Sequence, residues 1–404
     1  MSSSVASPPA AAAPPAVRSA ITLLALAAFF SGTALRICDG LLPRLASDFS
    51  ITTGVAGRVV LTFSIAYGIA QLAFGPLGDR FGKARLVCAA LFGCAAGALA
   101  CAVAPGFGAL VGLRMLWGVA AAGVIPLAMA WVGDNVPYEQ RQATLARLLM
   151  GTLSGMMAGQ VAGGFFGDSA LGWRGAFTTL GFGYLAVALL LLARLRTIPL
   201  APPVHSAGFF GFARQIGSVL AVPWARVVLV SALAEGIFLL GTLAYLPAYL
   251  HHRFGIALST AGAYIAMYAL GGLAYALSAR HIVRRFGERR MVRAGGIVMG
   301  AGFVAWYLAP AAWVAAPIAL AVGFGTYLYH NTLQTNATQM MPAVRGTAVA
   351  LFAFCLFFGQ AIGVSWAGYA FDHVGAAPLL LVPALGLPLA GWGFARAMHR
   401  RAST

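Results

Sequence analysis

The sequence predicts an all-α integral membrane protein, and two features carry that prediction. Of the 404 residues, 61% are hydrophobic and only 9% are charged, and the mean hydropathy is +0.86. A soluble domain carries about a quarter charged residues, so this chain cannot cover itself with a surface suited to water. The second feature is a series of long apolar runs, each of which is long enough to cross a bilayer as an α-helix.

The apolar runs that lie between polar residues number about twelve, taking about 20 residues as the length that spans the hydrocarbon core. The 50 glycines suit close packing of these helices, because small residues let helix backbones approach each other in lipid. The expected spans are residues 20–44, 56–78, 86–104, 108–133, 144–167, 176–194, 224–249, 258–280, 291–309, 313–338, 346–368 and 377–396.

The net charge of +17 indicates membrane orientation rather than a nucleic-acid partner. Cytoplasmic loops of membrane proteins collect Lys and Arg. If the N-terminus is cytoplasmic, the outside loops hold few basic residues, namely Arg44, Arg58, Arg174 and Arg253. We therefore expect a multi-pass protein of the plasma (inner) membrane with both termini in the cytoplasm.

The chain divides near its midpoint. The polar stretch at 194–226 contains several prolines and four arginines, which predicts a cytoplasmic linker at 197–222 between six-helix halves at 19–196 and 223–397. The Ser/Ala/Pro-rich residues 1–18 cannot form a packed core and are expected to be a disordered cytoplasmic tail. Residues 398–404 are expected to form a second cytoplasmic tail.

The two halves repeat each other. RFGKARLV at 80–87 is echoed by RFGERRMV at 285–292, and GQVAGG at 159–164 is echoed by GQAIGV at 359–364. Two repeats related by an axis along the membrane normal are typical of transporters, in which the substrate site lies near the midplane between the repeats.

Three motifs resemble those of the major facilitator superfamily. GPLGDRFGKARLV at 75–87 resembles that superfamily's signature between helices 2 and 3, and GLRMLWGVAAAG at 112–123 resembles its fourth-helix motif around a buried arginine. GMMAGQVAGG at 155–164 resembles the fifth-helix "antiporter" motif. The matching residues are Gly75, Leu77, Asp79, Arg80, Gly82 and Lys83 in the loop, Arg114 in the fourth helix, and Gly155, Gly159, Gly163 and Gly164 in the fifth, where Gln160 replaces the motif's proline.

The resemblance implies the major facilitator fold, with twelve helices in two pseudo-symmetric halves, and points to the bacterial drug:proton antiporter (multidrug efflux) branch. It also implies a gate latch in the loop, in which Asp79 helps to hold the two halves together at the cytoplasmic face near the start of span 346–368. Asp134, at the inner end of span 108–133, is the expected partner of Lys83 or Arg80.

Charged residues inside membrane helices are costly unless they are paired or hydrated, so each is a candidate functional residue. By the resemblance, helices 1, 4, 7 and 10 line the central cavity and helices 3, 6, 9 and 12 face lipid. In agreement, spans 1, 4 and 7 carry charged residues and span 10 carries a polar run, whereas the apolar interiors of spans 3, 6, 9 and 12 carry no charged residue. The candidate proton-coupling and substrate residues are Asp39, Arg36, Arg114, Glu235, His330 and Asn331.

Each of these residues has two readings. Glu235 lies near mid-bilayer, where it exchanges a proton or balances a cationic substrate, or else is satisfied by a neighbour for packing. Asp39 switches a contact with Arg114 during transport, or forms a static pair with Arg36 one helical turn away. His330 relays protons, or hydrogen-bonds within the cavity.

We expect a secondary active transporter that works by alternating access and exports small lipophilic or cationic compounds in exchange for protons. Uptake of a small metabolite, which Arg36 and Arg114 would bind if it is anionic, is the alternative, and a receptor on the same fold is a distant one. No nucleotide-binding loop, HExxH or GxSxG motif occurs in the sequence, so neither an enzyme nor a cofactor is expected. The expected partners are substrate, protons and lipid, and the expected functional unit is a monomer.

Overall fold

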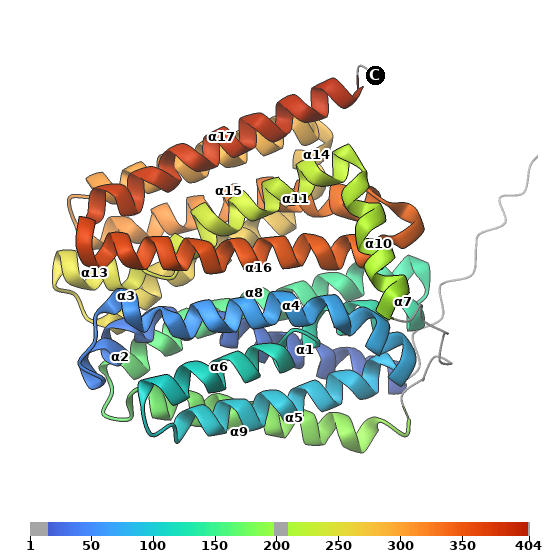
Figure 1. Cartoon of the computed structure of the whole chain (residues 1–404), viewed down its shortest axis with the longest axis horizontal. Coiled ribbons are helices and arrows are strands. Elements are labelled where there is room, and N and C mark those ends of the chain that lie inside the picture. Colours follow the sequence, from blue (N-terminus) through green and yellow to red (C-terminus); the bar gives the residue numbers. More distant parts are fainter. Residues whose placement is uncertain (1–14, 198–208, 403–404) are drawn as a thin grey trace, which may run out of the picture.

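The computed structural model describes residues 15–197 and 209–402, which are almost entirely helical and contain no β-strand. Figure 1 shows the helices running along the long axis of the molecule as two groups. The blue-to-green helices α1–α9 form one group, and the lime-to-red helices α11–α17 form the other. The chain is therefore a bundle of two halves, as the sequence predicts.

The N-terminal half contains six spans, several of which change helix type near an end. They are α1 (Pro15–Arg36) with the turn η1 (Asp39–Leu41) and α2 (Leu42–Asp48); α3 (Thr53–Ala56) with α4 (Arg58–Phe81); α5 (Lys83–Ala102); α6 (Phe107–Ala121) with α7 (Val124–Asn135); α8 (Tyr138–Asp168); and α9 (Gly172–Arg194).

The C-terminal half follows α10 (Phe209–Ala221) and repeats the pattern. Its elements are α11 (Pro223–Glu235) with the π-turn η2 (Gly236–Leu240), α12 (Gly241–Leu243) and α13 (Leu246–Phe254); α14 (Leu258–Leu308); η3 (Ala312–Val314) with α15 (Ala315–Gln339); η4 (Pro342–Val344) with α16 (Arg345–Tyr369) and the π-turn η5 (Ala370–Val374); and α17 (Ala376–Ala402).

Helix α14 is two spans joined at a glycine. Gly287 has φ 69° and ψ 158°, which interrupts the helix, and Gly82 has φ 88° at the equivalent place between α4 and α5. Only glycine adopts such positive φ angles at little cost. The described residues include ten helices of membrane-crossing length and apolarity, and dividing α14 and adding the 31-residue α8 gives the twelve spans expected from the sequence.

The packing of helices follows the internal repeat as well. A Cβ atom at Gly159 on α8 would lie 2.6 Å from the carbonyl oxygen of Thr33, and one at Gly359 on α16 would lie 2.3 Å from that of Leu233. Glycine at these positions brings the paired backbones into contact. Gly163 against Ile37 and Gly363 against Ile237 repeat this arrangement one turn further along.

Several boundaries differ from those expected. Residues 15–18 form the first turn of α1, and residues 209–221 of the expected linker form α10. Residues 398–402 of the expected C-terminal tail continue α17. Backbone hydrogen bonding extends a helix past the hydrocarbon core, so apolar length alone misplaces its ends. The remaining parts of these predictions, at 1–14, 198–208 and 403–404, lie outside the described residues.

Candidate functional site

Hydrogen bonds from Asp168 join the two halves at the end of the bundle where α2, α3 and α13 lie (Figure 1). Asp168 is the last residue of α8, and its carboxylate accepts hydrogen bonds from the backbone N–H groups of Leu258 (3.0 Å) and Ser259 (2.8 Å). The Ser259 hydroxyl donates a third hydrogen bond, at 2.6 Å. The first N–H groups of a helix lack partners within the helix, so a carboxylate from the N-terminal half satisfies the start of α14 in the C-terminal half.

Asp372, in η5, makes the reverse connection. Its carboxylate accepts a hydrogen bond from the backbone N–H of Gly54 at 2.9 Å and another from the hydroxyl of Thr52, at the start of α3. The Tyr245 hydroxyl donates to the Gly54 carbonyl at 3.2 Å. We call this end of the bundle, defined by Asp168, Asp372 and Tyr245, the closed end.

The opposite end of the bundle, which we call the basic end, carries α7, α10 and the C-terminal end of α17 (Figure 1). All described hydrogen bonds between residues 15–197 and residues 209–402 lie at the closed end. Toward the basic end, a groove of about 360 Å³ separates α1 and α8 from α14. Its lining is mostly apolar and includes Leu26, Phe29 and Leu273, with Arg147 as its charged member. The halves are thus sealed at one end and parted toward the other.

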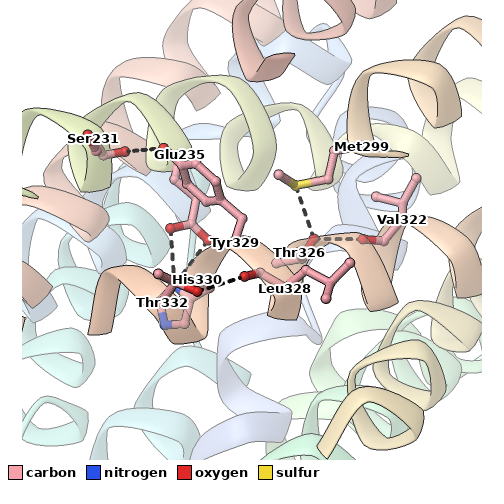
Figure 2. A network of polar contacts seen from close by, with 9 residues as sticks. All are labelled: Ser231, Glu235, Met299, Val322, Thr326, Leu328, Tyr329, His330 and Thr332. Carbon is pink, nitrogen blue, oxygen red and sulfur yellow. Dashed lines mark hydrogen bonds and ion pairs between the residues drawn. The ribbon is translucent and has the colours of Figure 1, made fainter. Parts of the chain in front are cut away.

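Between the two ends, Glu235 and His330 form a buried pair. Figure 2 shows the two side chains pointing toward each other from α11 and α15. The Nδ1 atom of His330 lies 3.0 and 3.1 Å from the two carboxylate oxygens of Glu235. The Glu235 residue is only 1% exposed, so its carboxyl group faces the histidine rather than water.

The surroundings of this pair are aromatic, and its backbone is irregular. The rings of Tyr327 and Phe352 lie 6.2 and 5.8 Å from the His330 ring, centroid to centroid. Glu235 immediately precedes the π-turn η2, and π-turns occur frequently at functional sites. The sequence prediction found both members of the pair but neither their contact nor the π-turn, because an apolar run does not reveal its hydrogen-bond register.

A second buried cluster lies in the N-terminal half. Arg36 Nη1 lies 3.4 Å from Asp39 Oδ2, and Gln160 Nε2 donates a hydrogen bond of 2.9 Å to the same oxygen. Among the described residues, Asp39 Oδ1 and Gln160 Oε1 are buried without a hydrogen-bond partner. The glutamine that replaces the motif's proline therefore links α8 to the carboxylate of α1.

Arg114 does not bond to Asp39 in this conformation. Its Nε atom donates to the Val59 carbonyl at 3.2 Å, and its guanidinium carbon lies 4.0 Å from the Phe63 ring centroid and 4.7 Å from that of Trp117. The faces of these aromatic rings attract the buried guanidinium. Asp39 is paired instead with Arg36, one helical turn away. The pairing of Asp39 with Arg36 is thus the one the structure contains.

Asn331 belongs elsewhere, because its amide donates to the Tyr275 hydroxyl at 3.0 Å. The structure therefore gathers five of the six predicted cavity residues into the two buried clusters and the aromatic cage of Arg114.

The predicted gate latch forms an ion-pair cluster within the N-terminal half. Lys83 Nζ lies 2.6 Å from Asp134 Oδ2 and 3.0 Å from Asp79 Oδ1, whereas Arg80 stacks on the neighbouring Phe81 ring at 5.2 Å. The expected Lys83–Asp134 contact is therefore present. The described contacts of Asp79 do not include α16, which fits halves that are parted at this end.

The fifth-helix motif acts as a packing surface. Cβ atoms at Gly155 and Gly163 would lie 2.0 and 2.3 Å from carbonyl oxygens of α1 and its C-terminal extension, while one at Gly164 would lie 2.3 Å from the Leu258 carbonyl oxygen of α14. The motif thus lets α8 approach both α1 in its own half and α14 in the other.

The sequence prediction missed Asp168, Asp372 and Tyr245. A signal was available in the repeat, because GGFFGD at 163–168 aligns with AGYAFD at 367–372, and ITTGVAG at 51–57 aligns with IALSTAG at 256–262. These segments carry the two aspartates and the two helix starts that they bind.

Twelve helices in two repeats, each with a buried cluster of charged residues, are the architecture of a multi-pass membrane transporter. The profile of the Major Facilitator Superfamily matches residues 24–364, and the chain belongs to that superfamily.

Three comparisons illustrate the relationship. The chain is 25% identical over 354 residues to an uncharacterized transporter of this superfamily, YceJ of Bacillus subtilis, and the match covers 86% of this chain and 89% of that protein. It is 30% identical over 155 residues to a chloramphenicol resistance protein of Streptomyces lividans, covering 38% and 39%. The crystal structure of a D-xylose–proton symporter superposes with a TM-score of 0.76 at 15% identity, covering 95% of this chain and 97% of that one.

Proposed function

We propose that the protein exports small lipophilic or cationic compounds in exchange for protons, by alternating access. The observation that carries the proposal is the Glu235–His330 pair. Both groups are titratable, and histidine changes charge near neutral pH. A proton that binds or leaves the pair therefore changes the charge buried in the C-terminal half, which a transport cycle needs in order to couple to a proton gradient.

The surroundings of the pair suit a lipophilic cation as the competing ligand. When His330 is protonated, a substrate cation that approaches Glu235 competes with its positive charge and favours loss of its proton. Tyr327 and Phe352 offer aromatic faces to which cations and apolar groups bind. The similarity to a chloramphenicol resistance protein supports a small organic compound as the substrate.

The orientation follows from the charge distribution. Because basic residues concentrate in cytoplasmic loops, we assign the basic end to the cytoplasm and the closed end to the outside of the plasma (inner) membrane. Both termini are then cytoplasmic, and the groove between α1, α8 and α14 opens inward. This is the conformation in which an exporter takes up its substrate, and a monomer is sufficient for it.

Proton-coupled uptake of a small anion is the second candidate. Arg114 Nη1 is buried without a partner among the described residues, and it could donate to a carboxylate or phosphate in the N-terminal half. The similarity to a sugar–proton symporter supports uptake as a direction available to this fold.

Proteoliposomes that contain a pH-sensitive dye in their lumen would separate the two candidates. When a compound enters the vesicle, antiport makes the lumen more alkaline and symport makes it more acidic. We expect alkalinisation with lipophilic cations and its loss in Glu235→Gln. The matched control is Glu139→Gln, which changes an exposed carboxylate in the first turn of α8 and should leave the proton flux unchanged.

Undiminished substrate-driven proton flux in Glu235→Gln would exclude the pair as the coupling site. Acidification upon addition of anions, with no response to cations, would favour uptake instead.

A further inference from the structure

A hollow of about 920 Å³ lies at the basic end, between the start of the second span of α14 and the last turns of α17. It lies apart from the buried clusters described above. Its walls carry four arginines: Arg289, Arg290 and Arg293 from α14 and Arg396 from α17. Spacings of three and four residues place the three arginines of α14 on one helix face.

These arginines have no anionic partner in the described parts of the chain, where no ion pair includes any of the four. The carboxylate in the wall, Glu288, instead accepts a hydrogen bond from Asn336 of α15 at 3.4 Å. Neighbouring guanidinium groups without a counter-charge repel one another. A bound anion would relieve this repulsion.

The hollow also contains aromatic and apolar side chains. Trp392 and Phe286 line it and are 50% and 51% exposed, and the guanidinium of Arg396 lies 5.2 Å from the Trp392 ring centroid. Tryptophan is enriched at the boundary between hydrocarbon and headgroups. With the basic end at the cytoplasmic face, as proposed above, the arginines would meet lipid headgroups and the rings would lie at the boundary with the hydrocarbon.

We propose that this hollow binds the phosphate headgroup of an anionic phospholipid. Arginine pairs with phosphate through two parallel hydrogen bonds, and basic pockets between transmembrane helices on the cytoplasmic side bind anionic headgroups. The volume lies within the range of about 300–1,000 Å³ that is typical of small-molecule sites. A lipid bound here would bridge the loop at Gly287 and the C-terminal end of α17, and so would join the eighth, ninth and twelfth spans.

Native mass spectrometry of the full-length protein in detergent tests the proposal. Phosphatidylglycerol is titrated onto the wild type, with phosphatidylcholine as the zwitterionic comparison. We expect phosphatidylglycerol to bind at least about tenfold more tightly, and the double variant Arg290→Gln/Arg293→Gln to lose about 30-fold in affinity, on the basis of the usual contribution of a basic residue near anionic lipid. Arg396→Gln, in the opposite wall, should lose about fivefold and serves as a second variant if the first does not fold.

The matched control is Arg284→Gln/Arg285→Gln, which removes two arginines from the same loop but not from the hollow. Its lipid affinity should stay within about threefold of the wild type, because these two side chains are exposed and do not line the hollow, so that they cannot bind the headgroup directly and their charges are screened by salt. An equal loss in the control would mean diffuse attraction to the loop and would overturn the proposal. Inorganic phosphate that displaces the lipid at concentrations similar to those of the lipid itself would assign the hollow to a soluble anion and would also overturn it.

Discussion

Asp168 and Asp372 make the same contact in opposite directions. Asp168 extends from the N-terminal half to the backbone N–H groups at the start of α14, and Asp372 extends from the C-terminal half to the backbone N–H at the start of α3. Each aspartate stands at the end of the corresponding helix of its repeat. The closed end is therefore held by two contacts that the internal duplication relates, and the halves cannot separate there without breaking both.

The first prediction is that weakening either contact opens the closed end. Asp168→Asn or Asp372→Asn removes the negative charge that the helix start favours. Hydrogen bonds to charged groups contribute about 1.5–3 kcal/mol, so each variant should shift the conformational equilibrium by about tenfold or more. Spin labels at positions 47 and 257, in a chain with its native cysteines replaced, should show a larger population at long distance by double electron–electron resonance.

Asp48→Asn is the control for this experiment. Asp48 lies at the same end, but it binds Arg44 at 2.9 Å and Trp173 at 3.0 Å within its own half. Its label distances should match those of the unsubstituted chain. If the label distance lengthened similarly in Asp48→Asn, or did not lengthen in Asp168→Asn and Asp372→Asn, the contacts of Asp168 and Asp372 would not be what holds this end closed.

The overall fold could be predicted from the sequence because its signals are local. The length of an apolar run fixes whether a helix can span the bilayer, and RFGERRMV marks the turn at Gly287 even though the helix continues on both sides of it. Repetition of short segments then indicates two equivalent halves. None of these inferences requires knowledge of which helices touch.

The site was predicted less completely because its contacts are tertiary. Glu235 and His330 could each be identified as unusual polar residues in a span, but their pairing depends on how α11 and α15 are rotated. Asp168 and Asp372 lie at helix ends, where a carboxylate is unremarkable until its partner in the other half is known. Gln160 shows the same limit, because a departure from a motif does not reveal that the new side chain binds Asp39.

The second prediction concerns the Arg36–Asp39 pair. Asp39→Asn leaves the Arg36 guanidinium buried without its counter-charge, which typically costs about 3–5 kcal/mol. The melting temperature of the purified protein should fall accordingly, and Arg36→Gln/Asp39→Asn should recover much of the loss because no unpaired charge remains. If the two substitutions lower the melting temperature additively, the pair makes no net contribution to stability.

The third prediction concerns the glycines that bring the helices together. Gly159→Ala and Gly359→Ala would each place a Cβ atom within 2.6 Å of a carbonyl oxygen in the neighbouring helix. Overpacking of this kind costs about 1–3 kcal/mol, so each variant should melt at a lower temperature, and by similar amounts since the contacts are equivalent. Gly112→Ala on α6 meets open space and should be neutral or stabilising by up to about 1 kcal/mol. If the melting temperature of Gly112→Ala fell as much as those of the other two variants, the loss of stability would come from the alanine itself and not from the helix contact.

The last prediction separates the contribution of the gate latch to transport from its contribution to the stability of the protein. The Asp79 side chain is 42% exposed and shares Lys83 with Asp134, and exposed ion pairs contribute only about 0–1 kcal/mol. Asp79→Asn should therefore leave the melting temperature and membrane insertion nearly unchanged. If Asp79 binds the start of α16 when the basic end closes, the loss of a carboxylate from a helix start, of up to about 2 kcal/mol, should reduce the transport rate in proteoliposomes by up to about thirtyfold. Asp134→Asn keeps the Asp79 carboxylate and should retain more transport. If Asp79→Asn transported normally, the charges in this loop would serve only to orient the protein in the membrane.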